Sequence, residues 1–109
     1  MAIIRKFLAK DNYTKVDNMV AANDALSDFA FRFYVYAAGF KNGFQLNDEY
    51  VSTALGWKHD KITRAKRELK KLDLIQVEKI DRKTYFLYIG SSKITATEVM
   101  KNWHDLENI

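Results

Sequence analysis

The chain has 109 residues and a formal net charge of +4, with 48% hydrophobic residues and no cysteine. This length suits one domain with one modest core, and the lack of cysteine excludes a disulfide framework and a thiolate metal site. No apolar run approaches the roughly 20 residues that a membrane helix needs, and the N-terminal apolar run is too short for a signal peptide. We therefore expect a single cytoplasmic domain over residues 1–109, with no metal, no other cofactor and no membrane contact.

The N-terminal third contains the longest apolar stretch of the chain. Residues 2–9 are apolar with a basic pair, and their pattern leaves a strand and a short helix equally open. A short helical turn is predicted over residues 18–23, followed by a long helix within residues 26–40, where hydrophobic side chains recur at helical spacing. Ser27 suits the N-cap of this helix, and Gly39 is expected to end it as a C′ glycine.

A second helix is predicted after a turn at residues 41–43 and a short strand at residues 44–46. Asn47 can cap this helix, because acidic residues fill the first turn after it. Gly56 is expected to end it. The side chains expected to face the core are Tyr50, Val51, Ala54, Leu55 and, in the following turn, Trp57.

The third predicted helix, residues 58–72, is strongly basic. It holds seven Lys or Arg against one Asp and one Glu, and Asp60 could cap its start. Over residues 58–83 the net charge is +5, against −1 for the rest of the chain, so the positive charge is local. Local charge of this kind favours a polyanion-binding face, and the alternative is a solvated helix flank with a Glu68 salt pair. Its apolar stripe consists of Ile62, Ala65, Leu69 and Leu72.

The C-terminal third predicts a β-hairpin and a last helix. Residues 75–80 and 84–89 are rich in β-forming residues and are separated by three polar residues. Phe86 is expected to point into the core. A final helix is predicted over residues 98–107, with Thr97 as its N-cap. Its apolar face is expected to consist of Val99, Met100, Trp103 and Leu106.

This order of helix, short strand, helix, turn, basic helix and hairpin resembles a winged helix-turn-helix domain over roughly residues 25–90. The turn Leu55-Gly56-Trp57 and the stretch from Leu69 to Ile75, LKKLDLI, are similar to the family's pattern. The chain departs from the family at Lys58-His59, where Ser or Thr is common. It departs again at Asp73, where Gly is common and where Asp can still adopt a left-handed conformation.

The upstream segment Tyr13–Asn18, followed by Leu26-Ser27 and the aromatic helix, resembles winged-helix proteins carried on plasmids and phages of low-GC Gram-positive bacteria. Such domains occur in replication initiators, transcription regulators and accessory proteins of conjugative transfer. The resemblance thus implies an α+β winged helix-turn-helix fold with an added C-terminal helix. It also implies a sequence-specific regulator or accessory protein that binds double-stranded DNA at a promoter, a replication origin or a transfer origin.

We further expect a homodimer, whose surface would come from the N-terminal segment, the aromatic helix or the C-terminal helix. The two DNA-binding domains of the dimer could then read half-sites about one DNA turn apart. Other proteins of a replication or transfer complex are further candidate partners. The alternative is a winged-helix module that joins a larger protein assembly without touching DNA. An enzyme is not expected, because the sequence has no Gly-rich phosphate loop, no cysteine nucleophile and no carboxylate pair near a histidine.

The candidate DNA contacts lie on the basic helix and on the hairpin. Arg64 suits bidentate contact with guanine, and Thr63 suits a thymine methyl group. Later residues of the helix are suited to contact phosphates. The basic hairpin tip could contact the minor groove or the DNA backbone. The alternative for the tip is that its lysines only protect an exposed sheet edge from aggregation. The full set is Lys58, His59, Lys61, Thr63, Arg64, Arg67, Lys70, Lys71, Lys79, Arg82 and Lys83.

Overall fold

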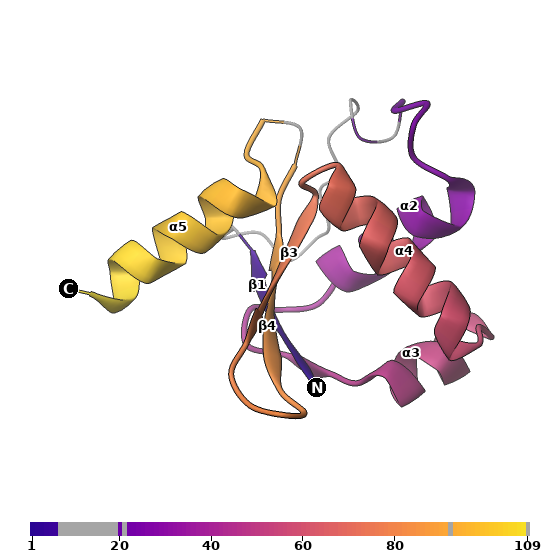
Figure 1. The fold of residues 1–109 in the computed structure, drawn as a ribbon, viewed down its shortest axis with the longest axis horizontal. Coiled ribbons are helices and arrows are strands. Elements are labelled where there is room, and N and C mark those ends of the chain that lie inside the picture. Colours follow the sequence, from indigo (N-terminus) through magenta and orange to yellow (C-terminus); the bar gives the residue numbers. More distant parts are fainter. Residues whose placement is uncertain (7–19, 21, 92, 109) are drawn as a thin grey trace.

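The computed structural model describes residues 1–6, 20, 22–91 and 93–108. The predictions for residues 7–19 and 21, which include half of the short helical turn and the whole Tyr13–Asn18 segment, lie outside these residues. The described part is an α+β domain with four helices and a four-stranded mixed sheet (Figure 1). Its elements are β1 (Ala2–Lys6), α2 (Asp28–Ala38), β2 (Gln45–Leu46), α3 (Asp48–Leu55), α4 (His59–Lys71), β3 (Ile75–Lys79), β4 (Tyr85–Ile89) and α5 (Ala96–Glu107).

The N-terminal strand occupies the middle of the sheet. The strand order is β2-β1-β4-β3, with β1 parallel to β4 and antiparallel to β2. All five residues of β1 pair with β4, from Ala2 opposite Tyr85 to Lys6 opposite Ile89. Of the strand and the short helix left open for residues 2–9, the structure thus shows a strand, at Ala2–Lys6. The hairpin of β3 and β4 is confirmed, with Ile75 opposite Ile89 and Lys79 opposite Tyr85.

The main core lies between one face of the sheet and the helices α2 and α4. The predicted stripe of α4 is confirmed, since Ile62, Ala65 and Leu69 are buried and Leu72 packs against them. These side chains meet others from α2 and from the strands. The fully buried members from those elements include Ala30, Phe33, Ala37, Ile4, Ile75 and Leu87.

The short helix α3 is buried less than the sequence suggested. Val51 is buried as expected, and Trp57 beyond the helix is also buried. However, Tyr50 is 55% exposed and Ala54 is exposed, so these two predictions were wrong. The helix has only eight residues, and Val51 is its one fully buried side chain.

Several predicted helix ends are confirmed. Ser27 Oγ accepts a hydrogen bond from Ala30 N, and Asn47 Oδ1 accepts one from Tyr50 N at 2.6 Å. Gly56 ends α3 in the left-handed conformation with φ +68°, and Asp73 tolerates φ +56° after α4. These left-handed residues let the chain reverse sharply on both sides of α4.

Three predicted ends were wrong. Gly39 ends α2 in the right-handed conformation, so it is not a left-handed C′ glycine. Asp60 lies inside the first turn of α4, and the N-cap position is taken by Lys58, which makes no side-chain cap bond. The last helix begins at Ala96 with Thr95 at its N-cap. Thr97 instead donates its hydroxyl to Asp73 Oδ1 at 2.7 Å, which fastens the start of α5 to the turn after α4.

Helix α5 covers the opposite face of the sheet, so the sheet is packed on both sides (Figure 1). Leu87 points into the main core, whereas Phe86 and Tyr88 point toward α5 because side chains alternate along a strand. The prediction that Phe86 faces the main core was therefore wrong. Leu106, expected on the apolar face of α5, is 48% exposed because the end of α5 extends beyond the sheet.

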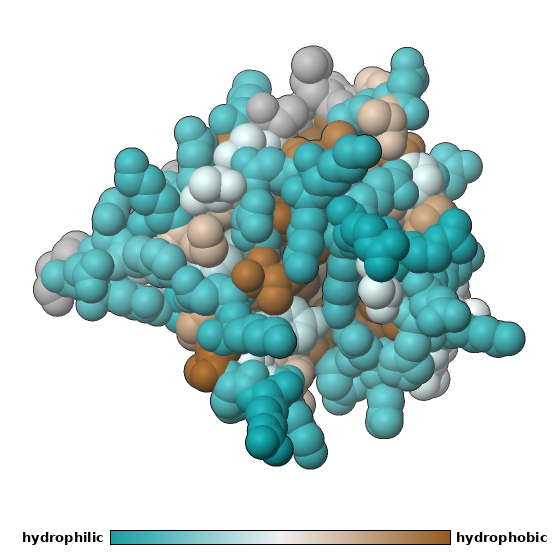
Figure 2. All heavy atoms as spheres, in the orientation of Figure 1, coloured by the Kyte–Doolittle hydropathy of each residue, from teal (hydrophilic) through white to brown (hydrophobic). Residues whose placement is uncertain are grey.

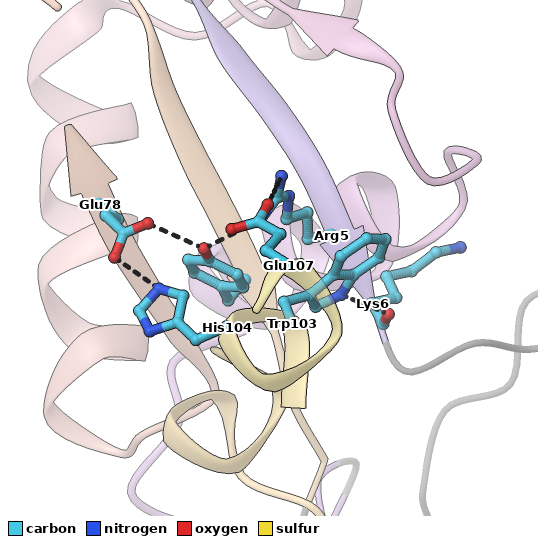
Figure 3. Close-up of polar contacts among 7 residues, drawn as sticks. Arg5, Lys6, Glu78, Trp103, His104 and Glu107 are labelled. Atoms are coloured by element: carbon cyan, nitrogen blue, oxygen red, sulfur yellow. Dashed lines mark hydrogen bonds and ion pairs between the residues drawn. The ribbon is translucent and has the colours of Figure 1, made fainter. Parts of the chain in front are cut away.

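A charged and aromatic cluster holds α5 on this outer face (Figure 3). The Arg5 guanidinium lies 3.4 Å from the ring centroid of Phe86 and 4.6 Å from that of Trp103. Its Nη2 atom pairs with Glu107 Oε1 at 2.6 Å. Arg5 thus joins β1, β4 and α5 through both its charge and its flat face.

Glu78 of β3 supplies a second link to α5. Its carboxylate accepts the Tyr88 hydroxyl at 3.0 Å and lies 2.8 Å from His104 Nε2 (Figure 3). Burial, together with the hydrogen bond to Glu78, raises the pKa of Tyr88 to about 12 from its ordinary 10.0. The protonated phenol is therefore the form that the folded state prefers.

This raised pKa predicts a loss of stability at high pH. The unfolded chain releases the Tyr88 proton near pH 10, and the folded chain releases it near pH 12. The stabilisation that protonated Tyr88 gives the folded state is therefore fully present below pH 10 and is lost as pH rises toward 12. This stabilisation should amount to about 3 kcal/mol. Urea unfolding at several alkaline pH values should show a shallower decline for Tyr88→Phe than for the wild type. Equal declines would contradict this account of Tyr88.

No helix in the described part of the chain is long and apolar enough to cross a membrane.

Candidate nucleic-acid interface

Helix α4 presents a basic face away from the core. Gly56, Trp57 and Lys58 connect it to α3, and its buried stripe fixes the opposite side toward solvent. Arg64, Arg67 and Lys71 follow one line along the helix because they are three and four residues apart. Polar surface covers this region in Figure 2. All eleven candidate residues are exposed, namely Lys58, His59, Lys61, Thr63, Arg64, Arg67, Lys70, Lys71, Lys79, Arg82 and Lys83.

These exposed cations have no acidic partner within the described residues. The ion pairs found there join Arg5 to Glu107, Lys66 to Asp48 and His104 to Glu78. Within α4, Asp60 is the one exposed acid, and it lies in the first turn where the helix dipole favours a negative charge. The positive charge of the face is thus available to an external anion.

Glu68 does not neutralise this face. Its carboxylate accepts hydrogen bonds from Ser27 N at 2.5 Å and from Ser27 Oγ at 2.8 Å. It therefore caps the start of α2 from a neighbouring helix, where the dipole also favours a carboxylate. The alternative of a Glu68 salt pair on the helix flank was wrong. Sequence patterns missed this contact because Ser27 lies 41 residues away along the chain.

Lys66 is the one basic residue of α4 that turns inward. Its Nζ atom lies 2.9 Å from Asp48 Oδ1 and 2.6 Å from the Tyr85 hydroxyl. Burial lowers the pKa of Lys66, but the contacts with Tyr85 and Asp48 outweigh burial and raise it overall. Lys66 thus ties α4 to the start of α3 and to the start of β4, beside the hairpin loop. The signal in the sequence was its place beside the stripe, four residues after Ile62.

An aromatic pair supports the first half of the basic face. The rings of Phe29 and Trp57 meet edge to face with centroids 6.2 Å apart. Lys61 Nζ lies 4.8 Å from the Trp57 centroid, and the Arg64 guanidinium carbon lies 5.5 Å from the Phe29 centroid. Such cation–π contacts restrict long side chains at little cost. Trp57 was predicted as a core residue, but its role beneath Lys61 was not.

The hairpin loop is held in shape by Asp81. Its Oδ1 atom accepts hydrogen bonds from Lys83 N at 2.9 Å and from Thr84 N at 2.8 Å, and these bonds lower the pKa of Asp81. Ile80 N also donates to Thr84 O at 2.9 Å. The loop therefore presents Arg82 and Lys83 on an ordered backbone. It lies in the lower half of Figure 1, as does the start of α4.

The arrangement suits binding of an extended polyanion. One helix offers a line of cations and, near its start, Thr63 and His59, while the nearby loop offers further cations. Among the residues that the structure describes, no group of three or more His, Asp or Glu side chains could hold a metal ion.

Comparison of the chain with models of known protein families, with curated proteins and with solved structures found no match.

Proposed function

We propose that this chain is a winged helix-turn-helix protein that binds double-stranded DNA, with α4 as the recognition helix and the β3–β4 hairpin as the wing. The observation that carries the proposal is the exposed basic face of α4, whose cations have no acidic partner in the described part of the chain. A straight α-helix of this size fits the major groove of B-form DNA. β1 and α5 are additions to the winged-helix order of elements.

The proposed roles follow from position. The first turns of α4 would reach base edges. Arg64 lies against the Phe29 ring, so its side chain would already be oriented before DNA binds. Arg67, Lys70 and Lys71 would contact phosphates. Arg82 and Lys83 of the ordered loop would reach the minor groove or the adjacent backbone.

The biological role put forward is that of a plasmid- or phage-type regulator or accessory protein. As a homodimer, it would mark a promoter, a replication origin or a transfer origin by reading two half-sites.

The first test is binding of the wild type to a mixed pool of short duplex DNA, followed by fluorescence anisotropy. If α4 neutralises about four phosphates, affinity should fall by about 100-fold between roughly 50 mM and 200 mM salt, because each contact releases a counterion. Absence of binding even at low salt would overturn the proposal. It would favour instead a module that joins a protein assembly.

A further inference from the structure

Helix α2, the turn after it and helix α3 carry four aromatic side chains that meet at the surface. The rings of Tyr36 and Phe40 lie edge to face with centroids 5.0 Å apart, and those of Phe40 and Phe44 are stacked with centroids 4.3 Å apart. Burial raises the pKa of Tyr36, and the nearby phenol of Tyr50 raises it further, so the fourth ring lies close to the other three. We call Tyr36, Phe40, Phe44 and Tyr50 the aromatic patch.

The aromatic patch is open to solvent at two of its rings. Phe44 is 39% exposed and Tyr50 is 55% exposed, while the other two rings are half-buried. The main chain at Phe44 is fastened to β1, because Ile4 N donates to Phe44 O at 3.0 Å and Gly43 N donates to Ile4 O at 2.9 Å. The Phe44 ring is thus held against Phe40 and still exposed, which suits it to extend the stack by one more flat ring.

Two exposed cations border the aromatic patch. Arg32 lies one helical turn before Tyr36 on α2, and Lys41 follows Phe40 in the turn. Neither cation forms an ion pair with any residue that the structure describes. One exposed acid, Glu49 in the first turn of α3, borders the same rings, so the cations outnumber it. This charge favours a polyanion that carries flat bases, and it disfavours a second copy of the chain, whose patch would bear the same charge.

The aromatic patch continues the candidate nucleic-acid interface. Phe29, whose ring centroid is 5.5 Å from the Arg64 guanidinium carbon, lies three residues before Arg32 on α2. Residues three and four apart are neighbours on a helix surface, so Phe29, Arg32 and Tyr36 follow one line. Helices α2, α3 and α4 also lie on the same side of the sheet (Figure 1). A nucleic-acid strand that leaves α4 could therefore follow cations and rings from Arg64 to Phe44.

We propose that the aromatic patch binds unpaired bases of a single DNA strand that continues from the duplex held by α4. Exposed aromatic rings accept bases of any sequence by stacking, while nearby cations contact the backbone of the strand. The inference rests on the duplex binding proposed above and names its substrate class, which is DNA in which a duplex joins a single strand.

The test compares two labelled DNAs by fluorescence anisotropy with the intact chain at one salt concentration. One is a blunt duplex, and the other is the same duplex with a thymidine overhang of about ten nucleotides, within the site size of a single-strand-binding module. The overhang should tighten binding by the wild type about 10-fold, because bases stack on the exposed rings. Phe44→Ala with Tyr50→Ala should abolish this gain and leave the affinity for the blunt duplex unchanged.

The matched control exchanges the two ring types. Phe44→Tyr with Tyr50→Phe keeps both aromatic rings and should keep the gain from the overhang, and circular dichroism checks the folding of both double variants. A wild type that binds the two DNAs equally would overturn the proposal and leave duplex binding by α4 standing. A gain that survives in the double alanine variant would also overturn it. Binding of neither DNA would overturn duplex binding as well.

A second measurement uses the wild type alone and so does not depend on how the variants fold. Iodouracil is placed in the overhang, cross-linked by light, and the attached residue is identified by mass spectrometry. Attachment at Phe44 or Tyr50 would support the proposal, and attachment confined to α5 would overturn it. Light scattering without DNA tests the other occupant. A wild-type dimer that the double alanine variant splits into single chains would assign the aromatic patch to a second copy and overturn the proposal.

Discussion

Replacing Gly90 with Ala is expected to destabilise the domain by about 3 kcal/mol or more. Gly90 lies where β4 turns toward α5, and a Cβ atom there would overlap the backbone of Thr95 and Ala96 and would lie 2.6 Å from Ile94 O. The neighbours are main-chain atoms, so they cannot move aside as a side chain could. Ala96 N also donates to Asp73 O at 2.9 Å, which fixes this segment against the turn after α4.

The same position anchors the main core. Gly90 N donates to Leu74 O at 2.9 Å, and the Tyr34 hydroxyl of α2 donates to Gly90 O. Urea unfolding of Gly90→Ala should be compared with that of Gly43→Ala. Gly43 has open space around it but a φ of +85°, so its substitution should cost only about 1–2 kcal/mol through backbone strain. Equal losses at the two positions would show that crowding at Gly90 is not the cause.

Replacing Arg64 and Arg67 together with Ala should weaken binding to duplex DNA by about 10- to 100-fold, because two cations of the central line of α4 are removed. The slope of log affinity against log salt should also become shallower by about two. Both side chains are exposed, so the stability of the fold should change little.

The matched control for this variant is Lys93→Ala with Lys101→Ala. It removes the same charge from exposed positions in or just before α5 and should keep nearly the wild-type affinity and salt slope. Anisotropy titrations of the three proteins at several salt concentrations provide the comparison. If the control weakens binding as much as the α4 variant does, net charge rather than α4 is responsible.

The helices that form the core could be predicted because each has a strong local signal in the sequence. The stripe of α4 recurs at helical spacing, and Ser27, Asn47 and Gly56 have the cap chemistry that they show in the structure. The eleven candidate residues are exposed because they lie outside that stripe or on the hairpin loop. Local periodicity is thus enough to separate the buried side of α4 from its charged side.

The remaining features depend on contacts between distant parts of the chain. The parallel pairing of β1 with β4 joins residues more than 80 positions apart, which no local pattern encodes. The sheet is covered on both faces, so strand alternation could not tell which face Phe86 would take. The contacts by which Lys66 and Glu68 join α4 to other helices were not predicted. Their partners, Asp48 and Ser27, belong to those other helices and are distant in the sequence.

The most direct test of the central claim is a nuclear magnetic resonance titration of the isotopically labelled chain with a short DNA duplex at low salt. The account predicts that amide signals of residues 58–71 shift most, with smaller shifts at residues 79–83, while those of α5 stay in place. Shifts centred on α5, or on the exposed aromatic residues Phe44 and Tyr50, would contradict the assignment of α4 as the DNA-binding helix.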